Sequence, residues 1–375
     1  MIDQKNKFAR SAVWLPVKIY ELALRFRVAA YETSYLKPKT LGASVISVGN
    51  ITVGGTGKTP LVEYIARYLA EEDFSVAILT RGYKRRSRGM KTLNLREVSP
   101  ASSGNSPGDL VSNGEARSEA IDYLDYGDEP TMLAQALPEV PIIVNRNRFE
   151  GGRLAERVAG SDVLIMDDGY QHMQLARDLN LLVIDATNPF GDFEIFPLGG
   201  LREPLYGLKR ADAVIVTRAN RAFDQSQLIT ILKHACGDKI PVMYFYSEIT
   251  RLRHLGSGIV YDARQFRGWN SALLCGVGNP EAFAEDVLDA GISIIGKNFF
   301  ADHHAYTQED LDRVSNKSRA DGAEIIITTK KDAVKLGRLK ESHAPIYAAE
   351  TEINSEDEVR FKSLLLRRVG KQTRS

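Results

Sequence analysis

The feature that most constrains this chain is the glycine-rich run from Thr52 to Thr59, which reads Thr-Val-Gly-Gly-Thr-Gly-Lys-Thr. A compact apolar stretch over 43–48 precedes the run, and a helical pattern over 59–69 follows it. Glycine lets the backbone turn its N–H groups inward around a phosphate chain, and the start of a helix adds the positive end of its dipole. In this context the run predicts a P-loop, in which Lys58 reaches the β- and γ-phosphates and Thr59 holds Mg²⁺.

A second element supports the P-loop, because the apolar stretch 163–166 leads directly into Asp167 and Asp168. A strand of this kind brings an aspartate to the Mg²⁺ beside the P-loop lysine. The two elements together predict binding of a nucleotide with Mg²⁺. Every residue of the glycine-rich run is expected to contact the nucleotide: Thr52, Val53, Gly54, Gly55, Thr56, Gly57, Lys58 and Thr59. Thr52 stands where the general P-loop template has glycine, so a strict pattern search would miss the run.

The rest of the chain alternates short apolar stretches with helical patterns, which predicts an α/β protein with a parallel sheet covered on both faces. Its 375 residues are enough for two domains, and its 43% hydrophobic and 26% charged residues exclude a disordered or collagen-like chain. We expect a P-loop NTPase-like parallel sheet domain, a second, smaller α/β domain and an N-terminal amphipathic helix. The expected limits are 1–40 for the helix, 41–207 for the P-loop domain, 208–355 for the second domain and 356–375 for a C-terminal helix and basic tail. Residues 96–118, rich in Ser, Gly, Asn and Pro, are predicted to form a mobile loop.

A near-neutral total charge hides a basic N-terminal segment. The net charge is +1, yet residues 1–40 carry eight basic and three acidic side chains, a net charge of +5. Two interpretations fit this segment: a helix lying in the surface of an anionic membrane, and a helix packed on the protein's own core. Its apolar residues recur near helical spacing at Trp14, Leu15, Ile19, Leu22 and Phe26. No run of 18 apolar residues occurs, so no membrane span is expected.

A second basic region follows the stretch 76–80 and contains no acidic residue. It consists of Arg81, Lys84, Arg85, Arg86, Arg88 and Lys91. Such a region suits an anionic target, such as a substrate phosphate or lipid headgroups. The charge would also suit nucleic acid, but no recognised nucleic-acid-binding module accompanies it, so no nucleic-acid partner is expected. The two cysteines form no CxxC pair, which fits a reducing compartment and gives no zinc site.

Seven blocks of the sequence together resemble one family. They are 49–60 (GNITVGGTGKTP), 80–84 (TRGYK), 127–130 (GDEP), 167–172 (DDGYQH), 197–204 (PLGGLREP), 302–304 (DHH) and 329–335 (TKKDAVK). On these blocks, from about residue 15 to 350, the chain resembles the tetraacyldisaccharide 4′-kinases, the lipid A 4′-kinases of Gram-negative bacteria. That family also has threonine at the position of Thr52. The resemblance implies two α/β domains joined by a hinge, with ATP and Mg²⁺ as cofactors.

The resemblance also implies a reaction, in which ATP phosphorylates the 4′-hydroxyl of a tetraacylated glucosamine disaccharide 1-phosphate to give lipid IVA. The implied partners are this lipid A disaccharide precursor and the anionic surface of the inner membrane, with no obligate protein partner. The implied location is the cytoplasmic face of the bacterial inner membrane, where the protein would be attached peripherally.

Individual site roles follow from the chemistry together with the resemblance. A sugar hydroxyl is a poor nucleophile, so a carboxylate near the γ-phosphate should orient it and accept its proton. Asp128 matches the family's catalytic acid; the alternative is that it only caps a helix over 128–137. The resemblance pairs His303 with Asp128, the alternative being a surface turn, and makes Lys58 catalytic. It adds Glu203 to the metal ligands. Substrate binding is assigned to Arg81, Tyr83, Arg148 and Arg202.

Other functions fit parts of the sequence. A membrane-associated P-loop ATPase or GTPase switch without a small-molecule acceptor fits the N-terminal segment and the run 329–332, which is similar to the guanine-binding signature of GTPases. Positioning ATPases, however, usually have a lysine where this chain has Val53, and we interpret the run 329–332 as a false match. A soluble sugar or nucleoside kinase is a third possibility, but its substrate would not require a basic amphipathic N-terminus.

Overall fold

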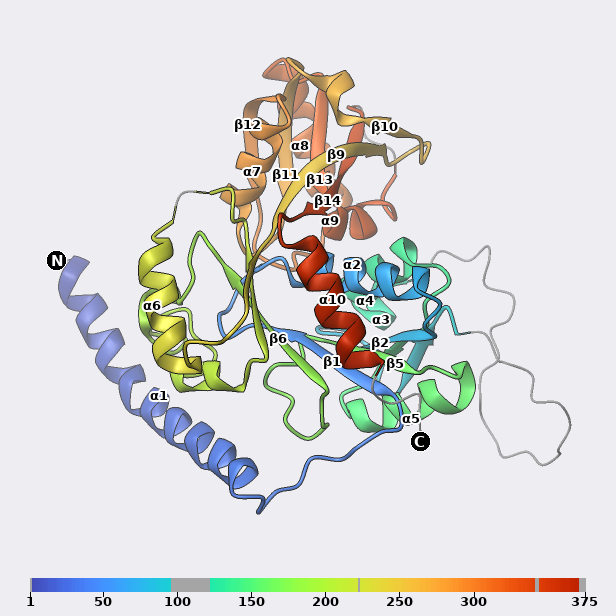
Figure 1. Cartoon of the computed structure of the whole chain (residues 1–375). Helices are drawn as coiled ribbons and strands as arrows, with labels where there is room; N and C mark the ends of the chain where they lie inside the picture. Colours follow the sequence, from blue (N-terminus) through green and yellow to red (C-terminus); the bar gives the residue numbers. More distant parts are fainter. Residues whose placement is uncertain (1, 96–121, 222, 341–343, 371–375) are drawn as a thin grey trace, which may run out of the picture.

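A computed structural model describes residues 2–95, 122–221, 223–340 and 344–370 of the chain. The predicted loop over 96–118 lies outside these residues. The described residues form two sheets, one of eight strands and one of six. Figure 1 shows the six-stranded sheet above the eight-stranded one. The chain is therefore the mixed α/β protein that the sequence predicts.

The eight-stranded sheet contains the P-loop and has the order β3-β4-β2-β5-β1-β6-β7-β8. Its strands are β1 (Ser44–Gly49), β2 (Val76–Thr80), β3 (Lys91–Leu93), β4 (Ile142–Val144), β5 (Val163–Asp167), β6 (Leu179–Asp185), β7 (Ala213–Thr217) and β8 (Val242–Tyr244). All neighbours pair in parallel except β3, which is antiparallel to β4. Every residue of β1, β2, β5 and β6 is buried, as expected where helices cover both faces.

Helices on the two faces of this sheet complete a three-layer sandwich. One face packs against α2 (Lys58–Glu71), α4 (Asp128–Ala136) and α10 (Glu358–Val369), through Leu61, Leu133 and Phe361 among others. The other face packs against α5 (Arg148–Ala159) and α6 (Gln225–Cys236). Shorter helices are α3 (Tyr123–Tyr126) and the 3-10 turns η1 (Gly191–Phe193), η2 (Leu205–Arg210) and η3 (Ala263–Phe266). The carboxyl ends of the strands remain available for a ligand site.

The six-stranded sheet has the order β10-β9-β14-β13-β11-β12. Its strands are β9 (Tyr246–His254), β10 (Val260–Asp262), β11 (Asn270–Cys275), β12 (Ser293–Phe299), β13 (Ile325–Thr329) and β14 (Ile346–Asn354), and its helices are α7 (Pro280–Asp289), α8 (Gln308–Ala320) and α9 (Lys330–Leu336). The strands β12, β11, β13 and β14 run parallel, whereas β9 and β10 form an antiparallel edge.

The change from one sheet to the other falls between Tyr244 and Tyr246, not near residue 208. The strands β7 and β8, which the sequence analysis assigned to the second domain, continue the first sheet beyond β6. Apolar parallel strands look alike in either sheet, so the sequence pattern could not show that β7 and β8 belong to the first sheet. The C-terminal helix α10 also returns to the first sheet, where Phe361 and Leu365 are fully buried (Figure 1).

The predicted N-terminal helix is present as α1 (Ile2–Glu32), which runs along the outside of the first sheet (Figure 1). Among the described residues of this helix, Val17 and Val28 are buried hydrophobic residues. Its predicted apolar face is instead exposed, and Leu15, Ile19 and Phe26 have exposed fractions of 59%, 61% and 69%. Most of that face therefore does not pack on the protein's own core. No described helix has both the length and the hydropathy required to cross a bilayer.

Candidate active site

The glycine-rich run forms the loop between β1 and α2, at the carboxyl edge of the first sheet. Gly57 is the N-cap of α2 with a φ of 74°, and Gly54 has a φ of 102°. Both angles are in the region that favours glycine, so the backbone requires glycine at these two positions of the run. The N–H of Val53 donates a hydrogen bond to the carbonyl of Gly200 at 2.7 Å. The run therefore has the strand–loop–helix context of a phosphate-binding loop.

Asn50, which the sequence analysis did not single out, holds this loop from inside. Its side chain is buried, and its Nδ2 donates to the carbonyl of Thr52 at 2.8 Å and to the hydroxyl of Thr56 at 3.0 Å. Its Oδ1 accepts a hydrogen bond from Lys58 Nζ at 3.0 Å. Lys58 also lies 3.5 Å from Asp168 Oδ1. The P-loop lysine is thus directed along the loop toward the end of β5.

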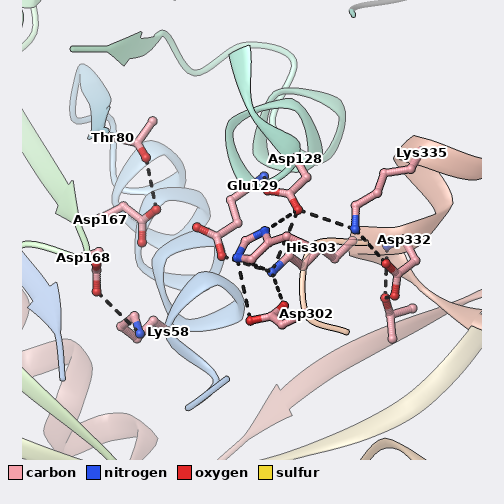
Figure 2. Close-up of polar contacts among 12 residues, drawn as sticks. Lys58, Thr80, Asp128, Glu129, Asp167, Asp168, Asp302, His303, Asp332 and Lys335 are labelled. Carbon is pink, nitrogen blue, oxygen red and sulfur yellow. Dashed lines mark hydrogen bonds and ion pairs between the residues drawn. The ribbon is translucent and has the colours of Figure 1, made fainter. Parts of the chain in front are cut away.

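Asp167 is a buried carboxylate at the end of β5. Its Oδ2 accepts a hydrogen bond from the Thr80 hydroxyl at 3.3 Å (Figure 2). Burial raises the pKa of Asp167 to about 7, and the nearby carboxylates Glu129 and Asp168 add to that effect. No described lysine or arginine forms an ion pair with it. A buried carboxylate without a cationic partner is suited to a metal ion.

The next residue, Asp168, has the opposite environment. Arg202 donates from Nη1 to both carboxylate oxygens at 2.9 Å. Removal from water raises the pKa of Asp168, but the charges of Lys58 and Arg202 outweigh it and lower the pKa to about 2. Asp168 is therefore ionised and links the P-loop lysine to Arg202.

Glu203 follows Arg202 and is almost completely buried. Arg210 Nη2 donates to its two carboxylate oxygens at 2.8 and 2.7 Å, and Gln171 Nε2 donates to Oε1 at 2.8 Å. The same Gln171 nitrogen donates to the carbonyl of Asn50 at 2.7 Å. Glu203 thus links Arg210 to Gln171, which also bonds to Asn50 just before the P-loop. The role of Glu203 as a metal ligand stays a prediction.

Asp128 and His303 meet across the two sheets (Figure 2). The Oδ2 of Asp128 lies 2.8 Å from His303 Nδ1, and its Oδ1 accepts a hydrogen bond from the N–H of Glu129 at 3.0 Å. The pairing that the resemblance implied is present in the structure. Gly127, with a φ of 100°, is the N-cap of α4 and Asp128 is its first residue, so Asp128 does not occupy the capping position. Its catalytic role stays a prediction. His303 lies in the turn after β12, with a φ of 62°.

The ionisation of Asp128 depends on its cationic neighbours. Burial on its own would raise the pKa of Asp128, but the hydrogen bond from His303 and the charges of Lys331 and Lys335 lower it to about 2. The Nζ atoms of Lys331 and Lys335 lie 3.9 and 3.6 Å from Asp128 Oδ2. Asp128 is therefore a carboxylate at neutral pH, in the form that can accept a proton.

The run 329–332 has a structural role that its similarity to a guanine-binding signature did not indicate. Asp332 is fully buried, and its Oδ2 accepts hydrogen bonds from the N–H of Gly276 at 2.9 Å and from the Thr329 hydroxyl at 2.8 Å. Its Oδ1 accepts one from Lys335 Nζ at 2.9 Å. Both oxygens are engaged in fixing the start of α9, which supports the interpretation of this run as a false match for base recognition.

A pocket of about 650 Å³ opens beside the P-loop at the carboxyl edge of the first sheet. Most of its polar lining is basic, and it includes three of the four predicted substrate-binding residues, Arg81, Arg148 and Arg202. The remaining lining residues are Tyr20, Arg27, Val53, Arg146, Asp168, Gln171, His172, Gln174, Phe196 and Leu201. Tyr20 and Arg27 come from α1, so this helix forms one wall of the pocket.

The four predicted substrate-binding residues differ in their surroundings. Arg148 is 4% exposed and donates to the carbonyl of Asp167 at 3.4 Å, and burial lowers its pKa to about 10. Tyr83 is 57% exposed and does not line the pocket; its ring lies 5.4 Å from that of His303, centroid to centroid. Arg81 and Arg202 line the pocket. The structure thus groups the three arginines and places Tyr83 beside the Asp128–His303 pair.

The second sheet also contacts the P-loop directly. A Cβ atom at Gly278 would lie 2.8 Å from the backbone nitrogen of Gly55 and 3.0 Å from the Cα of Gly54. Gly278 follows β11, in a loop that the sequence analysis did not single out. Only glycine allows so close an approach of two backbones. Nucleotide site and second sheet are therefore in contact at this point.

Comparisons with known proteins agree with this geometry. The sequence matches the family described as tetraacyldisaccharide-1-P 4′-kinase (LpxK) over residues 10–370. The chain belongs to this family. Curated relatives named tetraacyldisaccharide 4′-kinase include one from Halothermothrix orenii, 38% identical over 86% of this chain and 81% of the relative. Another, from Pelobacter propionicus, is 34% identical over 89% of this chain and 86% of the relative.

A solved LpxK structure has the same overall arrangement. It is described as the "apo" form of LpxK from Aquifex aeolicus in complex with ATP, and it matches with a TM-score of 0.70 and 29% identity. The match covers 96% of this chain and 99% of that chain. The tetraacyldisaccharide-1-P 4′-kinase fold therefore extends over both sheets. Membership of this kinase family does not favour the alternative of a switch protein without a small-molecule acceptor.

Proposed function

We propose that this protein transfers the γ-phosphoryl group of ATP to the 4′-hydroxyl of tetraacyldisaccharide 1-phosphate, forming lipid IVA. The observation that carries the proposal is the Asp128–His303 pair, with 2.8 Å between Oδ2 and Nδ1, beside a P-loop. The two parts lie at one site, because the N–H of His303 donates to the carbonyl of Gly276 at 3.2 Å, and Gly278, two residues later, lies against the P-loop backbone at Gly54 and Gly55. A nucleotide-binding loop beside a carboxylate that can accept the proton of a hydroxyl group is typical of a kinase.

Asp128 acts on the acceptor hydroxyl in this proposal. Its carboxylate orients the hydroxyl in line with the γ-phosphate and accepts the proton as the new P–O bond forms. His303 donates to Asp128 Oδ2 and so fixes the direction of the carboxylate. Lys58 stabilises negative charge on the phosphates. Because His303 belongs to the second sheet and Asp128 to a helix of the first, the catalytic pair requires both parts of the chain.

The residues at the end of β5 fit a divalent cation. Asp167 is buried and has no described ion-pair partner, and it lies on the strand next to the P-loop strand. The residues that would hold Mg²⁺ are Thr59, Asp167, Asp168 and Glu203. When bound, the ion neutralises charge that develops on the phosphate oxygens. Arg202 and Lys58 keep Asp168 ionised for this purpose.

The basic pocket is the proposed site of the substrate. Arg81, Arg148 and Arg202 supply guanidinium groups for the phosphate of the disaccharide, a ligand that arginine binds through paired N–H donors. Tyr83 is not part of this pocket, but its ring lies 5.4 Å from that of His303, beside the proposed reacting centre. The apolar side chains of Phe196 and Leu201 give the same pocket a surface for acyl chains.

The exposed apolar face of α1 supports attachment to a membrane, at the cytoplasmic face of the inner membrane of a Gram-negative bacterium. Four apolar side chains of this face are each more than half exposed: Trp14, Leu15, Ile19 and Phe26. Their contact with water is unfavourable, and burial in a lipid interface would remove it. Lys18 and Arg25 lie on the same helix and suit anionic headgroups. Since Tyr20 of this helix lines the basic pocket, a lipid substrate would reach the site from the membrane.

The proposal is tested by incubating the purified protein with Mg-ATP and the disaccharide 1-phosphate in detergent micelles and identifying the product by mass spectrometry. We expect a phosphorylated disaccharide from the wild type and little from Lys58→Met. ATP hydrolysis without any phosphorylated disaccharide would instead support a switch protein. Transfer to soluble sugars but not to the lipid would support a sugar kinase.

A further inference from the structure

Lys331 contacts both members of the Asp128–His303 pair and two further carboxylates beside it. Its Nζ is 3.3 Å from His303 Nε2 and 3.2 Å from Asp302 Oδ1. It also lies 3.6 Å from Glu129 Oε1 and 3.9 Å from Asp128 Oδ2. The side chain is 16% exposed. One ammonium group therefore contacts three carboxylates and the catalytic imidazole.

The contact with His303 decides where the imidazole carries its hydrogen. A lysine ammonium has three N–H donors and no acceptor, so it bonds to His303 Nε2 only as the donor. It lies closer to Nε2 than the Asp302 carboxylate does, with 3.3 Å to Lys331 Nζ against 3.7 Å to Asp302 Oδ2. The ring hydrogen then sits on Nδ1, the atom that lies 2.8 Å from Asp128 Oδ2. This tautomer donates to Asp128 and leaves the carboxylate ionised.

We propose that Lys331 is a positioning residue for phosphoryl transfer, which holds His303 in its neutral Nδ1–H form and thereby directs Asp128 toward the acceptor hydroxyl. This role rests on the proposed function. The charged groups in contact with His303 or Lys331 are Asp128 and Glu129 from α4 and Asp302 from the turn after β12. Lys335 of α9 contacts Asp128 from the same side and is itself paired with Asp332. Lys335 cannot replace Lys331, because it is already bound to Asp332 at 2.9 Å.

Burial would lower the pKa of Lys331, but Glu129, Asp128 and Asp302 raise it above its usual value, so the ammonium stays charged. Lys330 offers a matched comparison on the same helix. Its Nζ pairs with Glu63 of α2 at 2.8 Å across the same junction between the sheets. An equal loss of activity on replacing Lys330 or Lys331 would indicate that both lysines hold the two sheets together. A loss of activity only on replacing Lys331 indicates an effect on the catalytic pair.

The first test reads the imidazole directly, without any enzyme assay. The ¹⁵N chemical shifts of the ring nitrogens distinguish the two neutral tautomers and the charged ring, and His303→Ala assigns the signals among the six histidines. We expect the Nδ1–H form in the wild type and in Lys330→Met, and loss of that form in Lys331→Met. An Nε2–H or charged ring in the wild type, or an unchanged ring in Lys331→Met, would overturn the proposal.

The second test is a double-mutant cycle in the phosphorylation assay, with ATP affinity measured for every variant. Lys331→Met should lower kcat at least about tenfold, with a KM for ATP within about twofold of the wild type. In a protein that already contains His303→Ala, adding Lys331→Met should lower kcat little further. Equal losses in both backgrounds, or the same loss in Lys330→Met, would show a docking role only. If Lys331→Met does not fold, Lys331→Gln takes its place in the cycle, with a loss of at least about threefold expected only when His303 is present.

The two tests separate failure of this inference from failure of the proposed function. A wild-type protein that makes no phosphorylated disaccharide contradicts the proposed function, and the ring-nitrogen shifts still decide what Lys331 does to His303. An active wild type with an Lys331→Met variant that keeps its kcat contradicts the inference alone.

Discussion

Adjacent residues of this protein are held in opposite electrostatic states by their neighbours. Asp167 and Asp168 follow one another at the end of β5, yet burial raises the pKa of the first to about 7 while Lys58 and Arg202 hold that of the second near 2. Neighbouring carboxylates with such different pKa values are typical of sites that bind metal or transfer protons. The difference arises from which side chain receives a cationic partner, a detail that the Asp-Asp sequence cannot specify.

His172 gives a prediction at the residue scale. Its burial lowers its pKa to about 4, and Arg148, Arg177 and Arg27 contribute further. The unfolded chain therefore binds a proton near pH 6.5 that the folded protein takes up only near pH 4, so the free energy of unfolding falls as the pH drops through this range. His172 should account for about 1–2 kcal/mol of this decrease in the free energy of unfolding, after allowance for partial exposure, and His172→Gln should lack that contribution. Urea unfolding at pH 7 and at pH 4.5 measures it; identical pH dependence in both proteins would contradict the assignment.

Arg202 gives a second prediction at this scale. Its guanidinium donates to both oxygens of Asp168 and lines the basic pocket, two roles that a lysine ammonium cannot fill together. We expect Arg202→Lys to raise the KM for the lipid substrate at least about tenfold while the affinity for ATP changes less. Steady-state kinetics with each substrate varied in turn provides the measurement. A larger change in ATP affinity than in the lipid KM would place Arg202 on the nucleotide instead.

At the scale of elements, the sequence predicted the features that depend on residues close together along the chain. The P-loop, β5 with its two aspartates, and most helices and strands could be predicted because each depends on contiguous residues. The N-cap of α4 was placed one residue too late, because Gly127 with its positive φ, and not Asp128, forms it. The edge strands β3 and β10 have three residues each and gave no periodic signal.

Contacts between elements could not be predicted in the same way. The pairing of Asp128 with His303 came from the resemblance to a family, because the two residues lie 175 positions apart. Lys331 was missed as a neighbour of this pair, since its run looks like a base-recognition signature. The neighbouring His304 illustrates the difficulty: it pairs with Asp310 at 3.0 Å, and nothing in the Asp-His-His sequence indicates which histidine faces the site.

The loop after β11 gives a prediction at the element scale. An alanine at Gly278 would press against the backbone of Gly54 and Gly55, and the P-loop would have to move. We expect Gly278→Ala to weaken ATP binding about tenfold, measured by calorimetry. Gly296→Ala on β12 is the matched control, because its Cβ would meet Ala272 at an ordinary 3.5 Å. Equal affinity for ATP in both variants would show that the contact does not reach the nucleotide site.

At the scale of the whole molecule, three parts of the chain meet at the carboxyl edge of the first sheet. The first sheet supplies the P-loop and the basic pocket, the second supplies His303 and Lys331, and α1 forms a wall of the pocket with its apolar face exposed. The near-neutral charge of +1 conceals this arrangement, since five arginines line the pocket and α1 has more basic than acidic residues.

The exposed face of α1 gives the prediction that belongs to this scale. Replacing Trp14, Leu15 and Ile19 with serine removes apolar area that would enter a lipid interface, and should reduce recovery with vesicles containing anionic lipid about tenfold or more. Val359→Ser on α10 is the control, because that side chain is 83% exposed but far along the chain from α1. Vesicle flotation provides the measurement. Recovery of the triple variant at the level of the control would contradict membrane attachment through this face.

The central claim is that the carboxylate of Asp128 acts on the lipid hydroxyl at a site built from both sheets. The most direct measurement is the single-turnover rate of γ-phosphoryl transfer from saturating ATP to the disaccharide 1-phosphate, in the wild type and in Asp128→Asn. We expect Asp128→Asn to bind ATP with nearly unchanged affinity and to transfer the phosphoryl group about 10²-fold or more slowly. A transfer rate in Asp128→Asn close to that of the wild type would contradict the claim.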